Sequence, residues 1–352
     1  MRWPLVLATA ALCACTATPS PDEVTDPPTP STATTSPVAE EPPGPLTIAV
    51  AGDVHFEGAL RARLADPATA LAPVTGTLAA ADLAIVNLET SVGTGGRPDP
   101  AKRFTFQAPP IAFRALSAAG IDVASMANNH ALDYGRAAFG STFDAIDGAS
   151  LAVIGIGRNA DAAFAPAVSE IRGTSVATIG ATLASTDPTA DPTGHWAATA
   201  DSPGTADAVD PKRLLKAVTD ADGSADVVVV YLHWGVQGEA CPSGGQRALA
   251  ADLVKAGADI IVGSHAHELQ GDGRLGPGYV AYGLGNYAWY TEGVTGVLTL
   301  TVRPPLEPAG RARVVDHVWT PARIGADGLP RELTDATDFD TELATLRRCA
   351  GF

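Results

Sequence analysis

Short runs of branched apolar residues alternate along this chain with alanine-rich stretches that have helical spacing. Runs of the first kind predict strands, because branched side chains suit a pleated surface, and stretches of the second kind predict helices. The predicted strands lie at 46–55, 83–90, 150–158, 174–180, 225–235, 258–267, 278–290 and 296–303, and two predicted helices lie at 111–120 and 246–257. This alternation indicates an α/β fold.

The run Val227–Val230 is the strongest strand signal, because four consecutive valines are apolar on both faces. We therefore expect a central, buried strand there. The Pro- and Asp-rich stretch 185–211 lacks such a pattern and is predicted to be a surface excursion. The sequence has no internal repeat, so we expect one domain over 46–304 and a tail over 305–352 that packs on it.

The first 15 residues have the pattern of a secretory signal peptide. Arg2 precedes an apolar run, Trp3 to Ala14, that is too short to cross a bilayer as a helix. The letters LCAC, which end at Cys15, resemble a lipobox, whose last cysteine is lipidated after cleavage; ordinary signal-peptidase cleavage is the alternative. Residues 16–45 predict a disordered, Pro- and Thr-rich tether. We expect an exported lipoprotein, anchored by its lipid to the extracytoplasmic face of the cell membrane.

The net charge of the 352-residue chain is −16, from 23 Lys and Arg against 39 Asp and Glu. Such a balance argues against a nucleic acid or an anionic membrane held by bulk electrostatics. An anionic substrate therefore needs a local cation, such as a metal ion. The sequence pattern does not indicate an oligomeric state.

Two cysteines remain once Cys13 is removed with the signal peptide and Cys15 is lipidated. Two cysteines that remain in an oxidising compartment usually pair. We therefore expect a disulfide between Cys241 and Cys349, which would staple the C-terminal tail to the loop after LHWG. Two unpaired thiols are the alternative.

Polar side chains gather at the ends of the predicted strands. Ligands of α/β sheets collect beyond the carboxyl ends of the strands, so residues distant in sequence converge there. Five of the seven histidines lie at these ends, and only His195 and His317 lie elsewhere. The strand-end residues are Asp53, His55, Asn87, Glu89, Asn128, Asn129, His130, His233, His265 and His267.

Each of these motifs, taken singly, has a structural alternative. Asp53 and His55 fit a turn with a solvated imidazole. The pair Asn128–Asn129 fits a turn that caps a helix, and His233 fits a histidine of the core. The five segments together favour a metal site.

One alanine separates His265 from His267. In an extended backbone, residues i and i+2 point to the same face, so we expect both rings to project together as a chelating pair. Two surface histidines are the alternative. Nitrogen and carboxylate donors of this mix suit Zn²⁺, Mn²⁺ or Fe, held as two divalent ions bridged by one carboxylate.

The chain resembles the CapA-type capsule (poly-γ-glutamate) synthesis proteins of the calcineurin-like metallophosphoesterase superfamily. The resemblance extends from TIAVAGDV to VAYGLGNY and rests on motifs in the family's order: GDV, NLET, FQAPP, DVASMANNHALDYG, LHWG, GADIIVGSHAHELQG and GLGNY. It implies a four-layer αββα sandwich, with two sheets between helices and a dinuclear metal centre at one edge.

The resemblance also implies roles for single residues. One ion would be held by Asp53, His55 and His267, and the other by Asn129, His233 and His265. His130 would be the general acid that protonates the leaving group or steadies the oxyanion, and Asp133 would orient its ring.

One motif departs from the superfamily pattern. Typical phosphoesterases place Gly-Asp after the second strand to supply a bridging aspartate, whereas here that strand ends in VNLET. We expect Glu89 to bridge the ions, with Asn87 as the alternative. If neither bridges, metal affinity and phosphoesterase activity both fall.

Three functions fit this sequence. The first is an exported, metal-dependent hydrolase in which activated water attacks a phosphate ester or a γ-amide. The second is synthesis, processing or export of an anionic, poly-γ-glutamate-like capsule polymer, with or without hydrolysis. The third is a non-enzymatic cell-surface protein that binds or anchors such a polymer and keeps a vestigial metal site. The nearly complete ligand set favours a CapA-type hydrolase, and nothing in the sequence selects phosphate ester over γ-amide.

Overall fold

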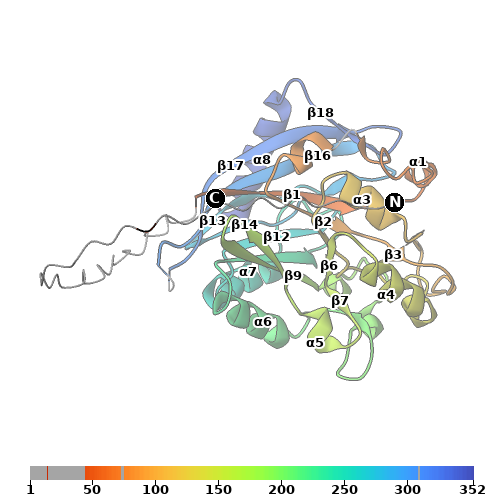
Figure 1. The fold of residues 1–352 in the computed structure, drawn as a ribbon. Helices are drawn as coiled ribbons and strands as arrows, with labels where there is room; N and C mark the ends of the chain where they lie inside the picture. The colour runs from red at the N-terminus through yellow and green to blue at the C-terminus, as the bar shows by residue number, and fades with distance from the viewer. Residues whose placement is uncertain (1–13, 15–43, 73–74, 308–309) are drawn as a thin grey trace, which may run out of the picture. The chain divides into compact units, whose positions relative to one another are not determined.

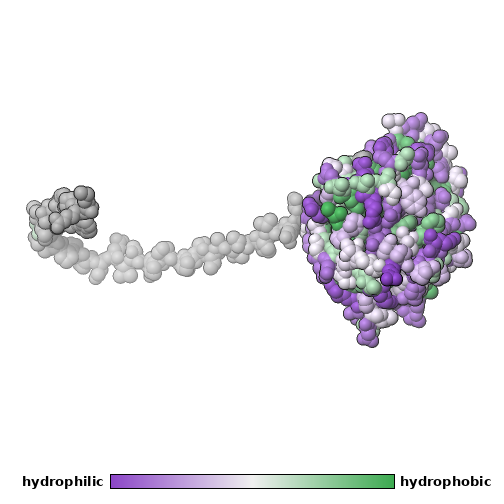
Figure 2. All heavy atoms as spheres, turned by 90° about the vertical axis from the view of Figure 1, so that its right-hand side faces the viewer, coloured by the Kyte–Doolittle hydropathy of each residue, from purple (hydrophilic) through white to green (hydrophobic). Residues whose placement is uncertain are grey.

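The computed structural model describes residues 14, 44–72, 75–307 and 310–352. Nearly all of the predicted signal peptide and tether lies outside the described residues, as does Cys15, which is predicted to be lipidated. No helix in the described ranges is long and apolar enough to cross a membrane. Figure 2 shows hydrophilic and hydrophobic residues interspersed over the face that it presents.

The larger sheet has eight strands among the described residues (Figure 1). In spatial order they are β18 (Pro330–Glu332), β17 (Arg313–Ile324), β16 (Gly293–Arg303), β1 (Leu46–Val54), β2 (Leu83–Leu88), β5 (Val123–Ser125) and β6 (Ala152–Ile154), with β15 (Asn286–Ala288) beside β1. Strands β1, β2, β5 and β6 run parallel, whereas β16 is antiparallel to β1. The C-terminal segment therefore does more than pack on the domain, because it supplies β17 and β18 to this sheet.

The smaller sheet has six strands within the described residues. They are β13 (Asp272–Leu275), β14 (Gly278–Ala281), β12 (Ile260–His265), β11 (Val227–Trp234), β9 (Thr174–Thr182) and β8 (Ala167–Ile171). Strand β11 lies parallel to its neighbours β9 and β12, and all of its residues are buried. The four valines thus form the central strand that the sequence predicts. The predicted strands 278–290 and 296–303 do not lie side by side in one sheet, because β14 joins this sheet and β16 joins the larger one.

Helices and short strand pairs complete the described fold. The helices are α1 (Ala59–Arg63), α2 (Thr75–Ala79), α3 (Ala112–Ala118), α4 (Phe139–Asp147), α5 (Ala160–Ala163), α6 (Lys212–Asp222), α7 (Gly244–Ala256) and α8 (Thr337–Ala350), with 3₁₀ turns η2 (Arg136–Ala138), η3 (Ala184–Thr186) and η4 (Gly194–Trp196). The short pairs are β3 (Ser91–Val92) with β4 (Gln107–Ala108), and β7 (Ile156–Gly157) with β10 (Gly204–Thr205).

Alternate residues of each central strand pack on opposite faces of their sheet, because the side-chain period of a strand is two. In β11, Val229 and Tyr231 belong to an apolar cluster that lies between the two sheets, together with Ile48 of β1. Val228 and Val230 instead pack with residues of α6 and α7 on the outer face. Helix α3 similarly covers the outer face of the larger sheet. These clusters define the four-layer αββα sandwich, which confirms the expected fold class (Figure 1).

The C-terminal helix α8 is joined covalently to the loop that precedes α7. Cys241 and Cys349 form a disulfide, with Cα atoms 5.7 Å apart. The side chain of Arg247 donates to the backbone oxygen of Cys349 at 2.5 Å, and Nη2 of Arg347 lies 3.0 Å from Oδ2 of Asp272 in β13. Helix α8 is thus held to the domain by a covalent bond, a hydrogen bond and an ion pair.

Candidate metal centre

Two groups of potential ligand atoms lie at the carboxyl ends of the central strands. Within each group, the candidate atoms lie within 4.8 Å of one another. Glu89, His233 and His265 form the first group, and Asp53, Glu89 and His267 form the second. Glu89 belongs to both groups, which is the position expected of a bridging carboxylate.

Strand pairing explains why these residues converge. Asp53 on β1 stands in register with Asn87 on β2 and with Asn286 on β15. A close approach of backbones fixes this end of β1, because a Cβ on Gly52 would lie 1.8 Å from the backbone oxygen of Gly285. The Gly-Asp of the GDV motif therefore places Asp53 against the GLGNY loop.

Glu89, which follows β2, is completely buried. Its Oε1 lies 3.4 Å from Nε2 of His233, yet neither carboxylate oxygen has a hydrogen-bond partner among the described residues. Burial, together with the charge of Asp53, raises the pKa of Glu89 well above its usual range. A buried carboxylate without donors is costly, and a divalent cation on each side would satisfy both oxygens. The residues present therefore fit a pair of metal ions.

Asn87 has a different set of contacts. Its Nδ2 donates to Oδ1 of Asp53 at 2.8 Å and lies 3.1 Å from Nδ1 of His233. Its Oδ1 accepts from Nδ2 of Asn128 at 3.1 Å. Because both ends of this amide already orient neighbours, Glu89 is better placed than Asn87 to bridge two ions.

The second group is strongly charged. Nδ1 of His267 lies 3.4 Å from Oδ2 of Asp53 and 2.8 Å from Oδ1 of Asn286. Burial alone would raise the pKa of Asp53, but the contacts with His267 and His233 hold it below its usual range. Burial alone would lower the pKa of His267, but Glu89 and Asp53 raise it to about 9. Without metal this group therefore holds a proton on His267, which a bound cation would displace.

Two histidines of the first group meet a further potential ligand, Asn129. Nε2 of His233 lies 3.1 Å from Nδ1 of His265 and 2.6 Å from Oδ1 of Asn129. Burial lowers the pKa of His233 to about 3 and that of His265 to about 4. Both rings are therefore neutral at pH 7, the state in which an imidazole binds a metal ion.

The pair His265 and His267 does not chelate one ion from an extended strand. Strand β12 ends at His265, and both residues have left-handed backbone angles, with φ of 97° and 58°. The extended geometry expected from the sequence is therefore wrong. The turn directs His265 to the first ligand group and His267 to the second, and such sparsely populated φ values are typical of functional sites.

His55 lies beside the centre but belongs to neither ligand group. Its Nδ1 accepts from the backbone N–H of Glu57 at 3.0 Å, and its ring centroid lies 4.0 Å from that of Trp289. Burial, together with the nearby His130 and His267, lowers the pKa of His55 to about 3. In this structure His55 is a neutral ring packed among aromatic residues.

His130 belongs to a buried network behind the ligand groups. Its Nδ1 lies 2.6 Å from Oδ2 of Asp133, and its ring stacks on Phe106 at 4.1 Å. Its Nε2 points toward the centre, 3.9 Å from Oε1 of Glu89. Burial and the charge of Lys102 hold the pKa of His130 well below its ordinary value. Burial raises the pKa of Asp133 to about 7, although the charge of Lys102 opposes the shift.

Lys102 is a member of this network that the sequence pattern does not reveal. Its Nζ lies 2.7 Å from Oδ1 of Asp133, contacts the backbone oxygen of Asn129, and lies 4.9 Å from the ring centroid of Trp196. A buried ammonium needs such partners. Lys102 therefore contacts both Asp133, which is expected to orient His130, and Asn129, an expected metal ligand. In the sequence, its position shortly before the FQAPP motif is the one hint of this role.

Asp187 is a second residue that the sequence analysis missed. It lies in the stretch 185–211, predicted to be a surface excursion, yet its side chain is buried. Its Oδ2 lies 3.0 Å from Nε2 of His265, and its Oδ1 accepts from the backbone N–H and the hydroxyl of Thr189. A carboxylate that holds the outer nitrogen of a ligand imidazole fixes the orientation and tautomer of that ring.

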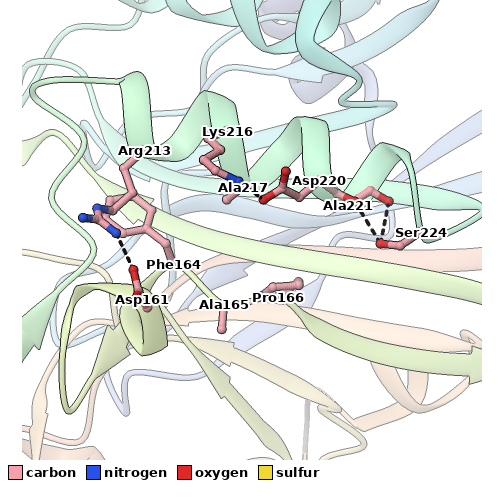
Figure 3. Close-up of a pocket in the computed structure, with 10 residues that line it drawn as sticks. All are labelled: Asp161, Phe164, Ala165, Pro166, Arg213, Lys216, Ala217, Asp220, Ala221 and Ser224. Carbon is pink, nitrogen blue, oxygen red and sulfur yellow. Dashed lines mark hydrogen bonds and ion pairs between the residues drawn. The ribbon is translucent and has the colours of Figure 1, made fainter. Parts of the chain in front are cut away.

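A cavity of about 250 Å³ opens beside His130 and His267. The other lining residues are Phe104, Phe106, Gln237, Asn286, Trp289, Tyr290 and Thr291. We therefore take this cavity as the approach to the ligand groups. A cavity of about 470 Å³ against α6, drawn in Figure 3, contains none of the ligand residues, and its Arg213 and Lys216 pair with Asp161 and Asp220.

Residues 47–290 match the family described as bacterial capsule synthesis protein PGA_cap, and the chain belongs to this family. The capsule biosynthesis protein CapA of Bacillus anthracis is 36% identical over 64% of this chain and 53% of its own length. The PGA biosynthesis protein CapA of Bacillus subtilis is 33% identical over 62% of this chain and 58% of its own. The match thus spans little more than half of these relatives. A phosphatase structure from Mycoplasma pneumoniae is 13% identical, covers 84% of this chain and 99% of its own, and has a TM-score of 0.47.

Proposed function

We propose that this protein is a metal-dependent hydrolase that acts in the synthesis, processing or export of a capsule polymer of the poly-γ-glutamate kind. The observation that supports hydrolysis best is the unpartnered, fully buried carboxylate of Glu89 between two ligand groups. Family membership and the names of the two CapA relatives support the polymer context.

The ligands for the two ions would be Asp53, Glu89 and His267 on one side and Glu89, His233, His265 and Asn129 on the other. His55 is an expected ligand of the first ion and lies outside this group in the structure. Two divalent ions held by these residues would polarise the bond under attack and would activate water, and the donor mix suits Mn²⁺, Zn²⁺ or Fe.

The protein's own catalytic group is His130. Its Nδ1 is fixed by Asp133 and its Nε2 points toward the centre, so a proton held at Nε2 can pass to a leaving group or steady a developing oxyanion. Lys102 holds Asp133 in place from behind. This arrangement favours catalysis over the alternative, a polymer binder with a vestigial site, because a binder does not require an oriented proton donor.

The experiment is metal analysis of the purified protein, followed by assays on p-nitrophenyl phosphate, bis-p-nitrophenyl phosphate and a γ-glutamyl polymer. Turnover of any of them by the metal-loaded protein, abolished by a chelator and restored by Mn²⁺ or Zn²⁺, is the expected result. Cleavage of the polymer alone would assign the γ-amide. Stoichiometric metal without turnover of any substrate would favour the binder.

We also propose that the protein is exported and anchored through a lipid on Cys15, with the residues before Cys15 as the cleaved part of the signal. The support is the LCAC sequence that ends an apolar run too short to span a bilayer. Mass spectrometry of the mature N-terminus tests this proposal. A diacylated peptide beginning at Cys15 is expected, and an unmodified Cys15 would refute the anchor.

A further inference from the structure

The approach cavity has aromatic walls and neither lysine nor arginine among its lining residues; its basic side chains are the two imidazoles of His130 and His267. Four of its lining residues are Phe104, Phe106, Trp289 and Tyr290. An adjoining cavity of about 400 Å³ shares His267, Asn286 and Thr291 with it, and adds three carboxylates, from Glu268, Glu292 and Glu342. A polymer with a carboxylate on every unit would be repelled along this path.

Phe104 is held in an exposed position by its neighbours in sequence. Its side chain is 59% exposed. The backbone N–H of Arg103 donates to Asp191 at 2.8 Å, and the guanidinium Nε of Arg103 donates to the same carboxylate at 2.7 Å. On the other side, the backbone N–H of Phe106 donates to Asp133 at 2.6 Å. Because Arg103 and Phe106 are both held in place, the backbone around Phe104 loses little further conformational entropy when a ligand binds to its exposed ring beside the cavity.

Tyr290, which also lines this cavity, is held in place by its neighbours as well. Its side chain is 44% exposed, and its ring stacks on Trp289 with centroids 5.5 Å apart. The ring centroid of His55 lies 4.7 Å away. Most large apolar side chains of the described residues are buried, so two fixed, exposed aromatic rings beside the same cavity indicate a binding surface.

We propose that Phe104 and Tyr290 form a subsite that stacks on an uncharged ring, of a sugar or an aryl group, adjacent to the bond that is cleaved. The inference rests on the proposed function of the site. A volume of about 250 Å³ equals that of roughly eight waters, which accommodates one ring and its substituents. The polymer is therefore engaged where it joins a ring-bearing group, and not along its anionic length.

Equilibrium binding of uncleavable ligands tests this subsite without turnover. Phenylphosphonate, α-D-glucosyl phosphonate, methylphosphonate and tri-γ-glutamate are titrated into the metal-loaded protein by calorimetry. The two ring-bearing phosphonates should bind about 2- to 10-fold more tightly than methylphosphonate, as expected for one stacked ring. Phe104→Ala and Tyr290→Ala should each remove most of that difference and leave methylphosphonate binding unchanged.

Two further variants serve as controls. Tyr290→Phe keeps the ring and should keep the preference. Phe352→Ala removes an exposed aromatic ring that lines neither cavity, and should change nothing. Equal binding of ring-bearing and methyl phosphonates, tighter binding of tri-γ-glutamate, or no binding of any phosphonate would overturn the subsite. Ring-selective binding without hydrolysis of any ester or γ-amide would instead refute the proposed function and leave the subsite standing.

Discussion

Nε2 of His265 lies 3.0 Å from Oδ2 of Asp187, a carboxylate that comes from a segment 78 residues earlier in the chain. The contact leaves Nδ1 of His265 facing His233 in the first ligand group. Burial alone would raise the pKa of Asp187, but His265 and three donors from Thr189 and Gln237 hold it below its usual range. Asp187 is therefore an ionised partner that orients the imidazole of His265, a candidate metal ligand.

Asp187→Asn should lower the metal affinity of the first group by about 10- to 100-fold, because the outer partner of a ligand histidine sets its orientation and basicity. Competition with a fluorescent chelator measures that affinity. Asp201→Asn, in the same segment but exposed, is the matched control and should bind metal as the wild type does. Unchanged affinity in Asp187→Asn would show that the contact is only structural.

His130→Ala should leave metal content nearly intact and slow turnover by about 10²- to 10⁴-fold, the usual contribution of a general acid. The loss should be smaller on p-nitrophenyl esters than on alkyl esters, because a good leaving group needs no proton. Metal analysis and the ratio of the two rates decide the matter. Loss of metal, or an equal loss on both esters, would make His130 a ligand or a structural residue.

Lys102→Met should keep the metal ions and lower the rate by about 10- to 100-fold, less than His130→Ala, because Lys102 acts through Asp133. It should also destabilise the fold by about 3 kcal/mol, since it leaves a buried carboxylate without its cation. Nitrogen-15 NMR of the His130 ring reports which ring nitrogen carries the proton, and this measurement does not depend on turnover. An unchanged ring tautomer together with a full loss of rate would argue against a positioning role.

The double variant Cys241→Ser/Cys349→Ser should unfold in urea with a stability lower by about 4–5 kcal/mol. The disulfide closes a loop over a sequence separation of 108 residues, and the chain-entropy model gives that magnitude. Helix α8 should remain docked, because Arg247 and Arg347 still hold it. Identical urea midpoints for the double variant and the wild type would show that the disulfide adds no stability.

The sequence predicts the layers of this fold well where its hydrophobic pattern is strong. Val227–Val230 could only be a strand buried on both faces, and the chain positions of β1, β2 and β12 follow from similar runs. It does not assign strands to two sheets, because the pattern of β16 is compatible with pairing on either β1 or β14. Non-local pairing of that kind is decided by packing.

The residues of the candidate site likewise divide into those that the sequence predicts and those that it does not. Glu89 is singled out by its place at a strand end, and the structure brings it into both ligand groups. The left-handed φ of His265 and His267 has no sequence signal, since neither residue is glycine. Asp187 lies in the stretch that the sequence predicts to be a surface excursion, and Lys102 lies in the loop between β3 and β4. Only the tertiary structure buries them beside their partners.

The number of metal ions bound per chain tests the central claim, that Glu89 bridges a dinuclear centre, most directly. The protein is loaded with Mn²⁺ or Zn²⁺ and dialysed, and elemental mass spectrometry then measures the moles of metal per mole of chain. The Glu89→Ala variant is measured in the same way. The control is Glu268→Gln, which changes an exposed residue next to His267. The account predicts two ions for the wild type and the control, and one or none for Glu89→Ala. A wild-type protein that retains one ion or none, or a Glu89→Ala variant that retains two, would contradict it.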